Sequence, residues 1–253
     1  MDLLDLNVSA QHEYDSKFFD YADQSVPSAA AIVPIVLDAL RCRSVLDVGC
    51  GTGAWLSVYR EMGAGDIEGI DGDYVDRTRL LIPDACFHAR DLARPFDLNR
   101  SFDLVQSLEV AEHIPYASSR TMVENLCRHG KHVMFSAAVP GQGGEHHINE
   151  QPLDFWRGLF KTQGFSAYDF IRPSVRGVAA VKSWYAYNTI LYVSDAAEAA
   201  LPESVRRWRV PDGAGIPDVA PMLFRIRTAL IRPLPVSVVS WLSVRGRRWL
   251  ARA

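Results

Sequence analysis

A glycine loop after an apolar run is the first feature of this chain that could bind a ligand. Residues 45–53 read Val-Leu-Asp-Val-Gly-Cys-Gly-Thr-Gly, so one acid, Asp47, precedes the glycines Gly49, Gly51 and Gly53. Glycine has no Cβ atom, which lets the backbone turn sharply and lets a ligand approach closely. A Gly-x-Gly-x-x-Gly loop uses the same strand–turn–helix geometry for a dinucleotide pyrophosphate, but here Gly53 comes one residue too early. Asp47 also suits a ligand with an ammonium group and hydroxyls better than a phosphate.

Acids follow the next two predicted strands. Asp71 ends an apolar run and lies eighteen residues after Gly53, where its carboxylate could accept two hydrogen bonds from a ribose diol. The alternative is that Asp71 caps the following helix, although Asp73 is better placed for that. After the third run come Asp91 and Leu92, and an Asp at this position can meet the amino group of an adenine. A purely structural role for Asp91 stays open.

Three histidines are candidates for moving a proton near neutral pH, the range in which imidazole titrates. His113 follows the fourth predicted strand, and His146 and His147 end a glycine-rich loop after the fifth. Each could instead have a structural role at a helix start or within the loop. Metal binding of His146 and His147 together with Glu145 or Glu150 is a further alternative, but adjacent histidines point in different directions on an extended chain and chelate poorly without help. We therefore predict no metal site.

Other polar and aromatic residues are candidates for contact with a second substrate. Asn149 and Gln151 carry amide groups that suit sugar hydroxyls, and loop-stabilising hydrogen bonds are the alternative. Tyr21, with Tyr14 and Phe18, precedes the first long helix, and we predict that this N-terminal segment folds over the site as a lid.

Alternating strands and helices must position these residues. Short apolar runs predict strands at 44–49, 66–71, 85–89, 102–107, 131–138, 165–171 and 186–193. The intervals predict helices at 27–41, 54–63, 117–129 and 152–163, with a weaker one at 74–81. This alternation is typical of a doubly wound, mostly parallel α/β sheet, in which ligands bind at the carboxyl ends of the strands. The last two strands have no obvious helix between them, which predicts an antiparallel pair at one edge.

The motifs together resemble those of the class I S-adenosylmethionine (SAM) methyltransferases. Residues 45–53 resemble their motif I, and residues 102–105 followed by Ser107 to His113 resemble motif IV of small-molecule enzymes of the type 11/12 and ubiquinone-biosynthesis kind. The resemblance implies a seven-stranded Rossmann-like sheet. It also implies that Asp47 and the three loop glycines hold the methionine part of SAM. On the same basis Asp71 would bind the ribose, Asp91 and Leu92 the adenine, and Ser107 and Glu109 the region near the sulfonium.

A bacterial subgroup of these enzymes carries a similar loop and late strand. The loop at 136–151 and the residues Trp184 to Asn188, taken as a strand, resemble that subgroup, whose members occur in sugar, surface-glycan and secondary-metabolite settings. The resemblance implies a small hydroxylated acceptor, with a sugar as the first candidate, methylated on oxygen with help from a histidine base. The alternatives are an N- or C-methyltransferase of another metabolite and a binding protein without turnover.

Composition limits the class of partner. A chain of 253 residues with 48% hydrophobic content can bury one substantial core, and a net charge of -3 argues against nucleic acid. The four cysteines show no CxxC pairing, and Asp2 and Asp5 give the N-terminus no secretory signal, so we expect a cytoplasmic protein.

The C-terminal part has a different charge from the rest. After Asp218 there is no acid while seven arginines remain, and the uncharged stretch 233–244 is shorter than the roughly 20 residues that span a bilayer. Three alternatives stay open for this tail: a membrane-surface contact at the inner face, an oligomer contact, and packing back on the domain. We therefore divide the chain into a lid at 1–26, a SAM-binding domain at 27–193, a linker at 194–218 and a basic amphipathic tail at 219–253.

Overall fold

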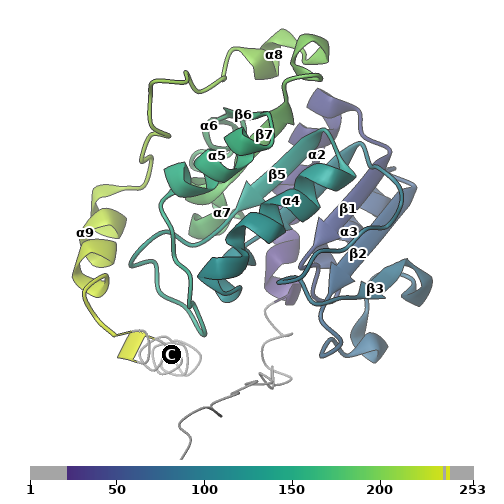
Figure 1. Ribbon diagram of the computed structural model, residues 1–253, viewed down its shortest axis with the longest axis horizontal. Helices are drawn as coiled ribbons and strands as arrows, with labels where there is room; N and C mark the ends of the chain where they lie inside the picture. Colours follow the sequence, from purple (N-terminus) through teal and green to yellow (C-terminus); the bar gives the residue numbers. More distant parts are fainter. Residues whose placement is uncertain (1–21, 236–237, 240–253) are drawn as a thin grey trace, which may run out of the picture.

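The computed structural model describes residues 22–235 and 238–239, which form an α/β domain around one seven-stranded sheet (Figure 1). The strands follow the order β3-β2-β1-β4-β5-β7-β6. Their bounds are Ser44–Val48 for β1, Asp66–Asp71 for β2, Phe87–Ala89 for β3, Leu104–Leu108 for β4, His132–Ser136 for β5, Phe165–Tyr168 for β6 and Ile190–Ser194 for β7. The predicted doubly wound, seven-stranded fold is confirmed.

The sheet is parallel except at β7. Strands β1 to β5 pair in parallel, whereas β7 runs antiparallel to both β5 and β6. The expected antiparallel pair, β6 and β7, therefore lies at the edge of the sheet. The reversed strand is β7, and β6 forms the edge itself. β1 and β4 are central and largely buried, which fits their mostly apolar sequences, and the buried polar residues Asp47, Gln106 and Ser107 interrupt these runs. Their carboxyl ends deliver Gly49 and Glu109 to the same edge of the sheet.

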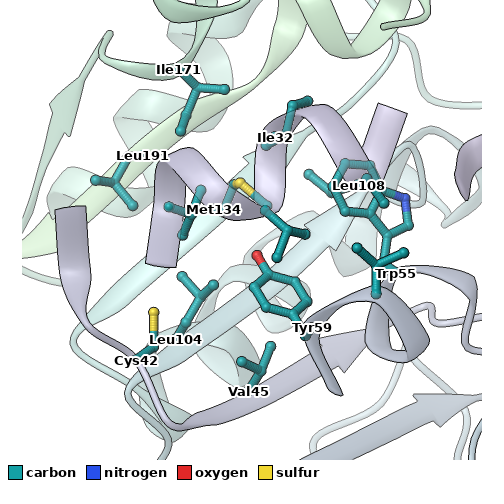
Figure 2. Close-up of a cluster of buried hydrophobic side chains, with 14 of the residues drawn as sticks. Ile32, Cys42, Val45, Trp55, Tyr59, Leu104, Leu108, Met134, Ile171 and Leu191 are labelled. Carbon is teal, nitrogen blue, oxygen red and sulfur yellow. The ribbon is translucent and has the colours of Figure 1, made fainter. Parts of the chain in front are cut away.

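Helices cover both faces of the sheet. The longer ones are α2 (Ala22–Leu40), α3 (Ala54–Glu61), α4 (Ser119–His129), α5 (Leu153–Thr162) and α9 (Met222–Ile231). Helices α2 and α3 pack on one face over a core that includes Ile32, Tyr59 and Met134 (Figure 2). Helices α4 and α5 pack on the opposite face through a second core around Met122 and Trp156. Helices α3, α4 and α5 each bury an apolar face against the sheet.

Two predicted elements differ from the observed ones. Residues Ser183–Asn188 form the short helix α7, so the predicted strand from 186, which includes the end of the Trp184 to Asn188 motif, was wrong over its first part. The predicted helix at 74–81 is only a 3-10 turn at Arg77–Arg79. A second short helix, α6 (Ile171–Ser174), also separates β6 from β7.

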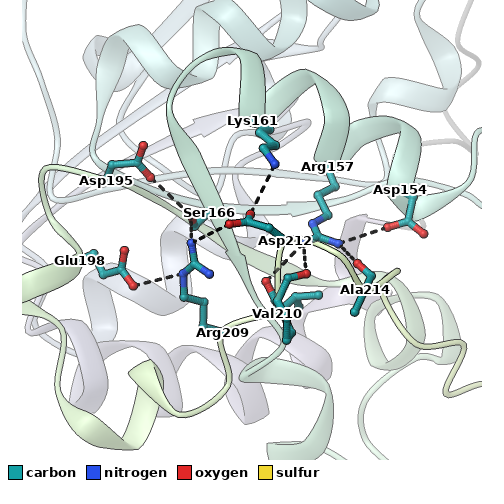
Figure 3. A network of polar contacts seen from close by, with 11 residues as sticks. Asp154, Arg157, Lys161, Ser166, Asp195, Glu198, Arg209, Val210, Asp212 and Ala214 are labelled. Atoms are coloured by element: carbon teal, nitrogen blue, oxygen red, sulfur yellow. Dashed lines mark hydrogen bonds and ion pairs between the residues drawn. The ribbon is translucent and has the colours of Figure 1, made fainter.

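The segment predicted as a linker packs against the edge of the sheet. It contains the short helix α8 (Glu203–Arg206), and its buried side chains are Ala197, Leu201, Val205, Val210 and Ile216. Polar contacts add to this packing: Arg157 of α5 donates to the carbonyl oxygens of Val210, Pro211 and Ala214 (Figure 3). These residues extend the domain core, while the three boundaries between the four predicted segments stay predictions.

Helix α9 contacts the loop that follows β5. The rings of Phe224 on α9 and Tyr187 on α7 lie 5.2 Å apart, and Arg227 donates to the carbonyl oxygen of Gln142 at 3.0 Å. The outer side of α9 exposes apolar side chains, among them Leu223 with 82% of its surface accessible. No helix in the described part of the chain combines the length and the apolar character needed to cross a membrane.

Candidate active site

The glycine loop joins β1 to α3, and its three glycines have different reasons to be glycine. All three adopt positive φ, at 86° for Gly49, 53° for Gly51 and 84° for Gly53. A Cβ atom on Gly49 would lie 2.3 Å from Val110, and one on Gly53 would lie 2.9 Å from Ile82. A Cβ atom on Gly51 would meet nothing within 4 Å. Tight packing therefore requires Gly49 and Gly53, whereas Gly51 borders open space where a ligand can approach the backbone.

Asp71 fastens this loop to the end of β2. Its carboxylate accepts hydrogen bonds from the backbone N–H of Gly51 at 2.7 Å, from that of Gly72 at 2.7 Å and from the Tyr74 hydroxyl at 2.5 Å. Burial raises the pKa of Asp71, and these three hydrogen bonds oppose the rise. Two of the donors already occupy Oδ1, so a diol that binds both oxygens of this carboxylate has to displace the Tyr74 hydroxyl.

Asp47 is a second buried acid beside the loop. It lies in β1 next to Gln106 of β4 and is 3% exposed. Burial raises the pKa of Asp47 to about 7; Gln106 lowers it, and the charge of Asp71 raises it further. Two interacting carboxylates at one strand edge favour a ligand that brings positive charge.

Asp91 and Leu92 follow β3, which continues the same edge. The backbone N–H of Arg90 donates to the Asp71 carbonyl oxygen at 2.8 Å, which places the residues after β3 beside the end of β2. The Asp91 side chain is exposed and accepts from the backbone N–H of Ala93 and from Arg94, while Leu92 is buried in the core. The proposed adenine contact of Asp91 stays a prediction.

Ser107 and Glu109 come from the end of β4. Ser107 is fully buried, and its hydroxyl has no hydrogen-bond partner among the described residues. Glu109 follows the strand with a φ of 57°, an uncommon conformation for a residue with a Cβ atom. Its carboxylate accepts from Gln142 at 2.8 Å and from Asn188 at 3.3 Å. Burial raises the pKa of Glu109, and these hydrogen bonds oppose the rise.

Gln142 and Asn188 are site residues to which the sequence reasoning gave no role. Gln142 belongs to the loop after β5 and Asn188 ends α7, and Asn188 also donates to the Gln142 side-chain oxygen at 2.8 Å. Only the fold brings them to Glu109. A late Trp-Tyr-x-x-Asn motif was visible in the sequence, but its assignment to a strand concealed this contact.

The structure brings two of the three candidate histidines together. The rings of His113 and His147 meet edge to face with centroids 5.0 Å apart. His146 has a φ of 58°, and its side chain, 43% exposed, lies 3.8 Å from Glu145. As expected for neighbours in the chain, His146 and His147 have different surroundings. The backbone oxygen of His146 contacts Nδ1 of His113 at 3.2 Å.

Glu150 organises the glycine-rich loop around His147. Its carboxylate accepts from the backbone N–H groups of Gly141 and Gly143, both at 2.7 Å, and contacts Nδ1 of His147 at 2.9 Å. The loop thus folds around one carboxylate that also orients the imidazole. Sequence reasoning considered Glu150 only as a possible metal ligand.

Glu112 is the most deeply buried acid of the site, and sequence reasoning missed it. It has no accessible surface, and neither carboxylate oxygen has a hydrogen-bond partner among the described residues. Burial raises its pKa well above the usual range, the charge of Glu109 adds to this, and the nearby backbone N–H groups of Glu112 and Ala138 oppose it. Glu112, His113 and His147 each offer one ligand atom, all within 4.8 Å of one another. Glu112 lies directly before His113 and three residues after Glu109, and this spacing was the signal in the sequence that could have marked it as a site residue.

The candidate acceptor-binding residues have structural roles where the chain is described. Asn149 is 2% exposed, and its amide donates to the Ala111 carbonyl oxygen and to the Ser119 hydroxyl. Gln151 donates to the Asn149 side-chain oxygen at 3.1 Å. These bonds use the Asn149 amide inside the fold, which favours the loop-stabilising alternative. Tyr21, with the predicted lid up to residue 21, lies outside the described residues.

Comparison with known proteins identifies the family. A profile for a methyltransferase domain matches residues 29–169, more than half of the chain. The chain belongs to this methyltransferase family. Its motifs and strand order are those of class I enzymes that depend on S-adenosylmethionine as the methyl donor. Among curated proteins, no sequence matches the chain.

Solved structures share the fold at low sequence identity. The sugar N-methyltransferase KedS8 from Streptoalloteichus has a TM-score of 0.54 at 16% identity, over 77% of this chain and 98% of its own. DesVI from Streptomyces venezuelae has a TM-score of 0.52 at 17% identity, over 72% of this chain and 97% of its own. An O-methyltransferase family protein from Burkholderia thailandensis has a TM-score of 0.53 at 15% identity, over 72% of this chain and 60% of its own. These likenesses establish the fold.

Proposed function

We propose that this enzyme transfers the methyl group of SAM to a hydroxyl of a small molecule, with a sugar as the preferred acceptor. The observation that supports oxygen as the acceptor atom is the His113–His147 pair, with Glu150 holding Nδ1 of His147. Methyl transfer is an in-line displacement: the O–CH₃ bond forms as the S–CH₃ bond breaks, and the electron pair stays on sulfur. An alcohol also has to lose its proton, and paired imidazoles suit that step near neutral pH.

The proposal assigns the cofactor contacts to the edge formed by β1, β2, β3 and β4. Asp47 and the loop glycines take the ammonium and carboxylate end of SAM, and Asp71 takes the ribose. Leu92 and Asp91 border the adenine, while Ser107 and Glu109 lie near the sulfonium. The open space at Gly51 and the two buried carboxylates beside it support this orientation.

A turnover assay with chemically matched acceptors tests the proposal. Purified enzyme with SAM is offered pairs of sugars that differ only in carrying a hydroxyl or an amine, and mass spectrometry with fragmentation locates the methyl group. We expect methylation on oxygen, and His147→Ala should lower kcat by about 10²- to 10⁴-fold. His146→Ala, in the same loop but with an outward side chain, should cause a much smaller loss.

Two other outcomes correspond to the alternatives. Methylation of amines that persists in both His113→Ala and His147→Ala favours an N-methyltransferase, which needs no strong base. SAM binding measured by calorimetry, without turnover on any acceptor, favours a binding protein. We propose no nucleic-acid partner, because the net charge is -3 and the arginines gather toward the C-terminus.

We also propose that α9 contacts an anionic membrane surface, which places a cytoplasmic enzyme at the inner face of the membrane. Met222, Leu223, Ile226 and Leu230 are exposed, and Arg225 lies on the same short helix. Exposed apolar side chains beside arginines are typical of helices that lie in a membrane interface. Full-length protein should float with vesicles containing anionic lipid, and Leu223→Glu with Leu230→Glu should abolish this. Self-association without flotation would instead favour an oligomer contact.

A further inference from the structure

We propose that Glu112, His113 and His147 form a binding site for one divalent transition-metal ion. Glu112 and His113 lie on the same 3-10 helix, Ala111–His113, directly after β4, and His147 comes from the loop after β5. Their ligand atoms lie within 4.8 Å of one another, so one ion between them can contact all three. Two imidazoles and a carboxylate are a common donor set for such ions.

The burial of Glu112 is the independent observation that points to a cation. Its side chain has no accessible surface, and neither oxygen has a hydrogen-bond partner in the described part of the chain. Buried polar groups in folded proteins are almost always paired, because removing a carboxylate from water without a partner is unfavourable. A bound cation beside the two histidines supplies that partner.

The surroundings of the imidazoles match those of metal-bound histidines. Nδ1 of His147 contacts the Glu150 carboxylate at 2.9 Å, and Nδ1 of His113 contacts the His146 backbone oxygen at 3.2 Å. Metal-bound histidines usually donate their second ring N–H to a carboxylate or a carbonyl oxygen, which fixes the tautomer and the ring orientation. We therefore assign Nε2 of each ring as the ligand atom.

The donor set selects the kind of ion. Imidazole nitrogen suits Zn²⁺, Co²⁺, Fe²⁺ and Mn²⁺, whereas Mg²⁺ and Ca²⁺ prefer oxygen ligands. Three protein ligands leave coordination positions open for an oxygen from outside the protein.

A role for the ion in the reaction rests on the proposed O-methyl transfer, whereas the binding site itself does not. When bound, such an ion would lower the pKa of an acceptor hydroxyl that contacts it. In the metal-loaded enzyme the two histidines would hold the ion, and the base role proposed for them above would belong to the metal-free enzyme. The proton would pass to water, and the oxygen would form the bond to the methyl group.

Metal binding to the chelator-treated full-length protein tests the site without any turnover. Calorimetry with Zn²⁺, and visible absorption with Co²⁺, should show one ion per chain. Glu112→Gln and His147→Ala should each weaken binding at least tenfold. His146→Ala is the matched control, because its imidazole is half-exposed and is not among the three clustered ligand groups, and it should keep the affinity. Thermal unfolding of each metal-free variant shows whether it folds.

A second variant acts on the site without changing a ligand. A Cβ atom on Gly144 would lie 2.0 Å from Nε2 of His147, so Gly144→Ala should displace that ring and weaken metal binding. The proposal is overturned if the wild-type protein binds neither ion at millimolar concentration, or if folded Glu112→Gln binds as tightly as wild type. Metal binding without turnover on any acceptor would contradict the proposed function and leave the metal site standing.

Discussion

At the scale of single residues, the sheet edge to which we assign the cofactor carries two buried acids that interact with each other. Asp71 holds the glycine loop through the backbone N–H of Gly51, and Asp47 lies below it in β1. Burial penalises the charged form of both, and a ligand with a cationic group offsets that penalty. The protonation state of Asp47 should therefore be coupled to cofactor binding.

SAM affinity should rise with pH around neutrality. The pKa of Asp47 is raised to about 7 in the cofactor-free protein, so the carboxylate that we propose as the partner of the ammonium group forms only as the pH passes that value. Calorimetry between about pH 6 and pH 8 should show tighter binding at the higher pH, with a plateau above. Asp47→Asn should bind weakly at every pH. A wild-type affinity that is flat across this range contradicts the role of Asp47.

The same shift predicts a change in stability. The unfolded chain ionises Asp47 near the ordinary aspartate pKa of 3.8 and the folded protein near 7, so this group favours unfolding increasingly as the pH rises between those values. Asp47→Asn should therefore raise the melting temperature of the cofactor-free protein at pH 8 and have little effect at pH 4. Differential scanning fluorimetry measures both, and an equal effect at the two pH values would contradict the assignment.

Tyr74 and Asp71 should have different effects on SAM binding. Asp71→Ala removes the acceptor of three hydrogen bonds and the proposed ribose ligand, so affinity should fall by about 2 kcal/mol or more. Tyr74→Phe removes only the competing hydroxyl, and affinity should stay the same or increase. Calorimetry on both variants checks this, and a large loss in Tyr74→Phe would show that the hydroxyl itself contacts the cofactor.

At the scale of elements, α9, α7 and the loop after β5 form one connected unit beside Glu109. Arg227 of α9 donates to the Gln142 backbone oxygen, and the Gln142 side chain links Glu109 with Asn188 of α7. The helix that we propose to contact a membrane is thus linked to Glu109 through Gln142.

Detaching α9 should loosen this loop. A Cβ atom on Gly141 would lie 2.1 Å from the Thr228 backbone oxygen, at a φ of 84°, so Gly141→Ala should force the loop and α9 apart. Hydrogen exchange should become faster in residues 139–143, and kcat should fall with SAM affinity little changed. Gly158→Ala, in α5 with open space around it, is the control. If hydrogen exchange in residues 139–143 is the same in Gly141→Ala as in the wild type, α9 does not hold this loop in place.

At the scale of the whole molecule, one buried ion pair joins the end of β6 to α6, and its arginine also contacts the backbone of α7. Arg172 and Asp169 pair through two hydrogen bonds of 2.7 Å each, and Arg172 also donates to the Tyr187 backbone oxygen at 2.9 Å. Both side chains are almost fully buried. This cluster holds α7, the helix that ends in Asn188, against the end of β6.

Removing one partner of this pair should be costly. Asp169→Asn leaves a buried arginine without its counter-charge, so the free energy of unfolding should fall by about 3–5 kcal/mol. The exposed pair of Arg206 and Glu203 is the matched control, and Arg206→Ala should cost less than about 1 kcal/mol. Urea unfolding measures the free energy of unfolding of both variants. Similar decreases in Asp169→Asn and Arg206→Ala would contradict the idea that burial makes the first pair important.

The sequence by itself determined the class of fold and placed the glycine loop and the acids that we propose for the cofactor at the ends of the strands. Apolar runs mark buried parallel strands because both faces of such strands are covered, and glycines and acids at their ends follow directly in the chain. The strand from Asp66 to Asp71 was therefore predicted with its observed bounds. The prediction of a strand at Trp184 to Asn188 was wrong. Aromatic residues favour strands locally, whereas these residues form a helix in which Tyr185 packs on Trp55.

The tertiary structure alone decided which polar residues meet. His113 and His147 are 34 positions apart, and only the parallel pairing of β4 with β5 brings their loops together. The fold also leaves Glu112 without accessible surface and the His146 side chain 43% exposed, and residue type alone predicts neither degree of burial. Local patterns reflect the burial of a strand or helix face, whereas contacts between distant side chains depend on how the elements pack.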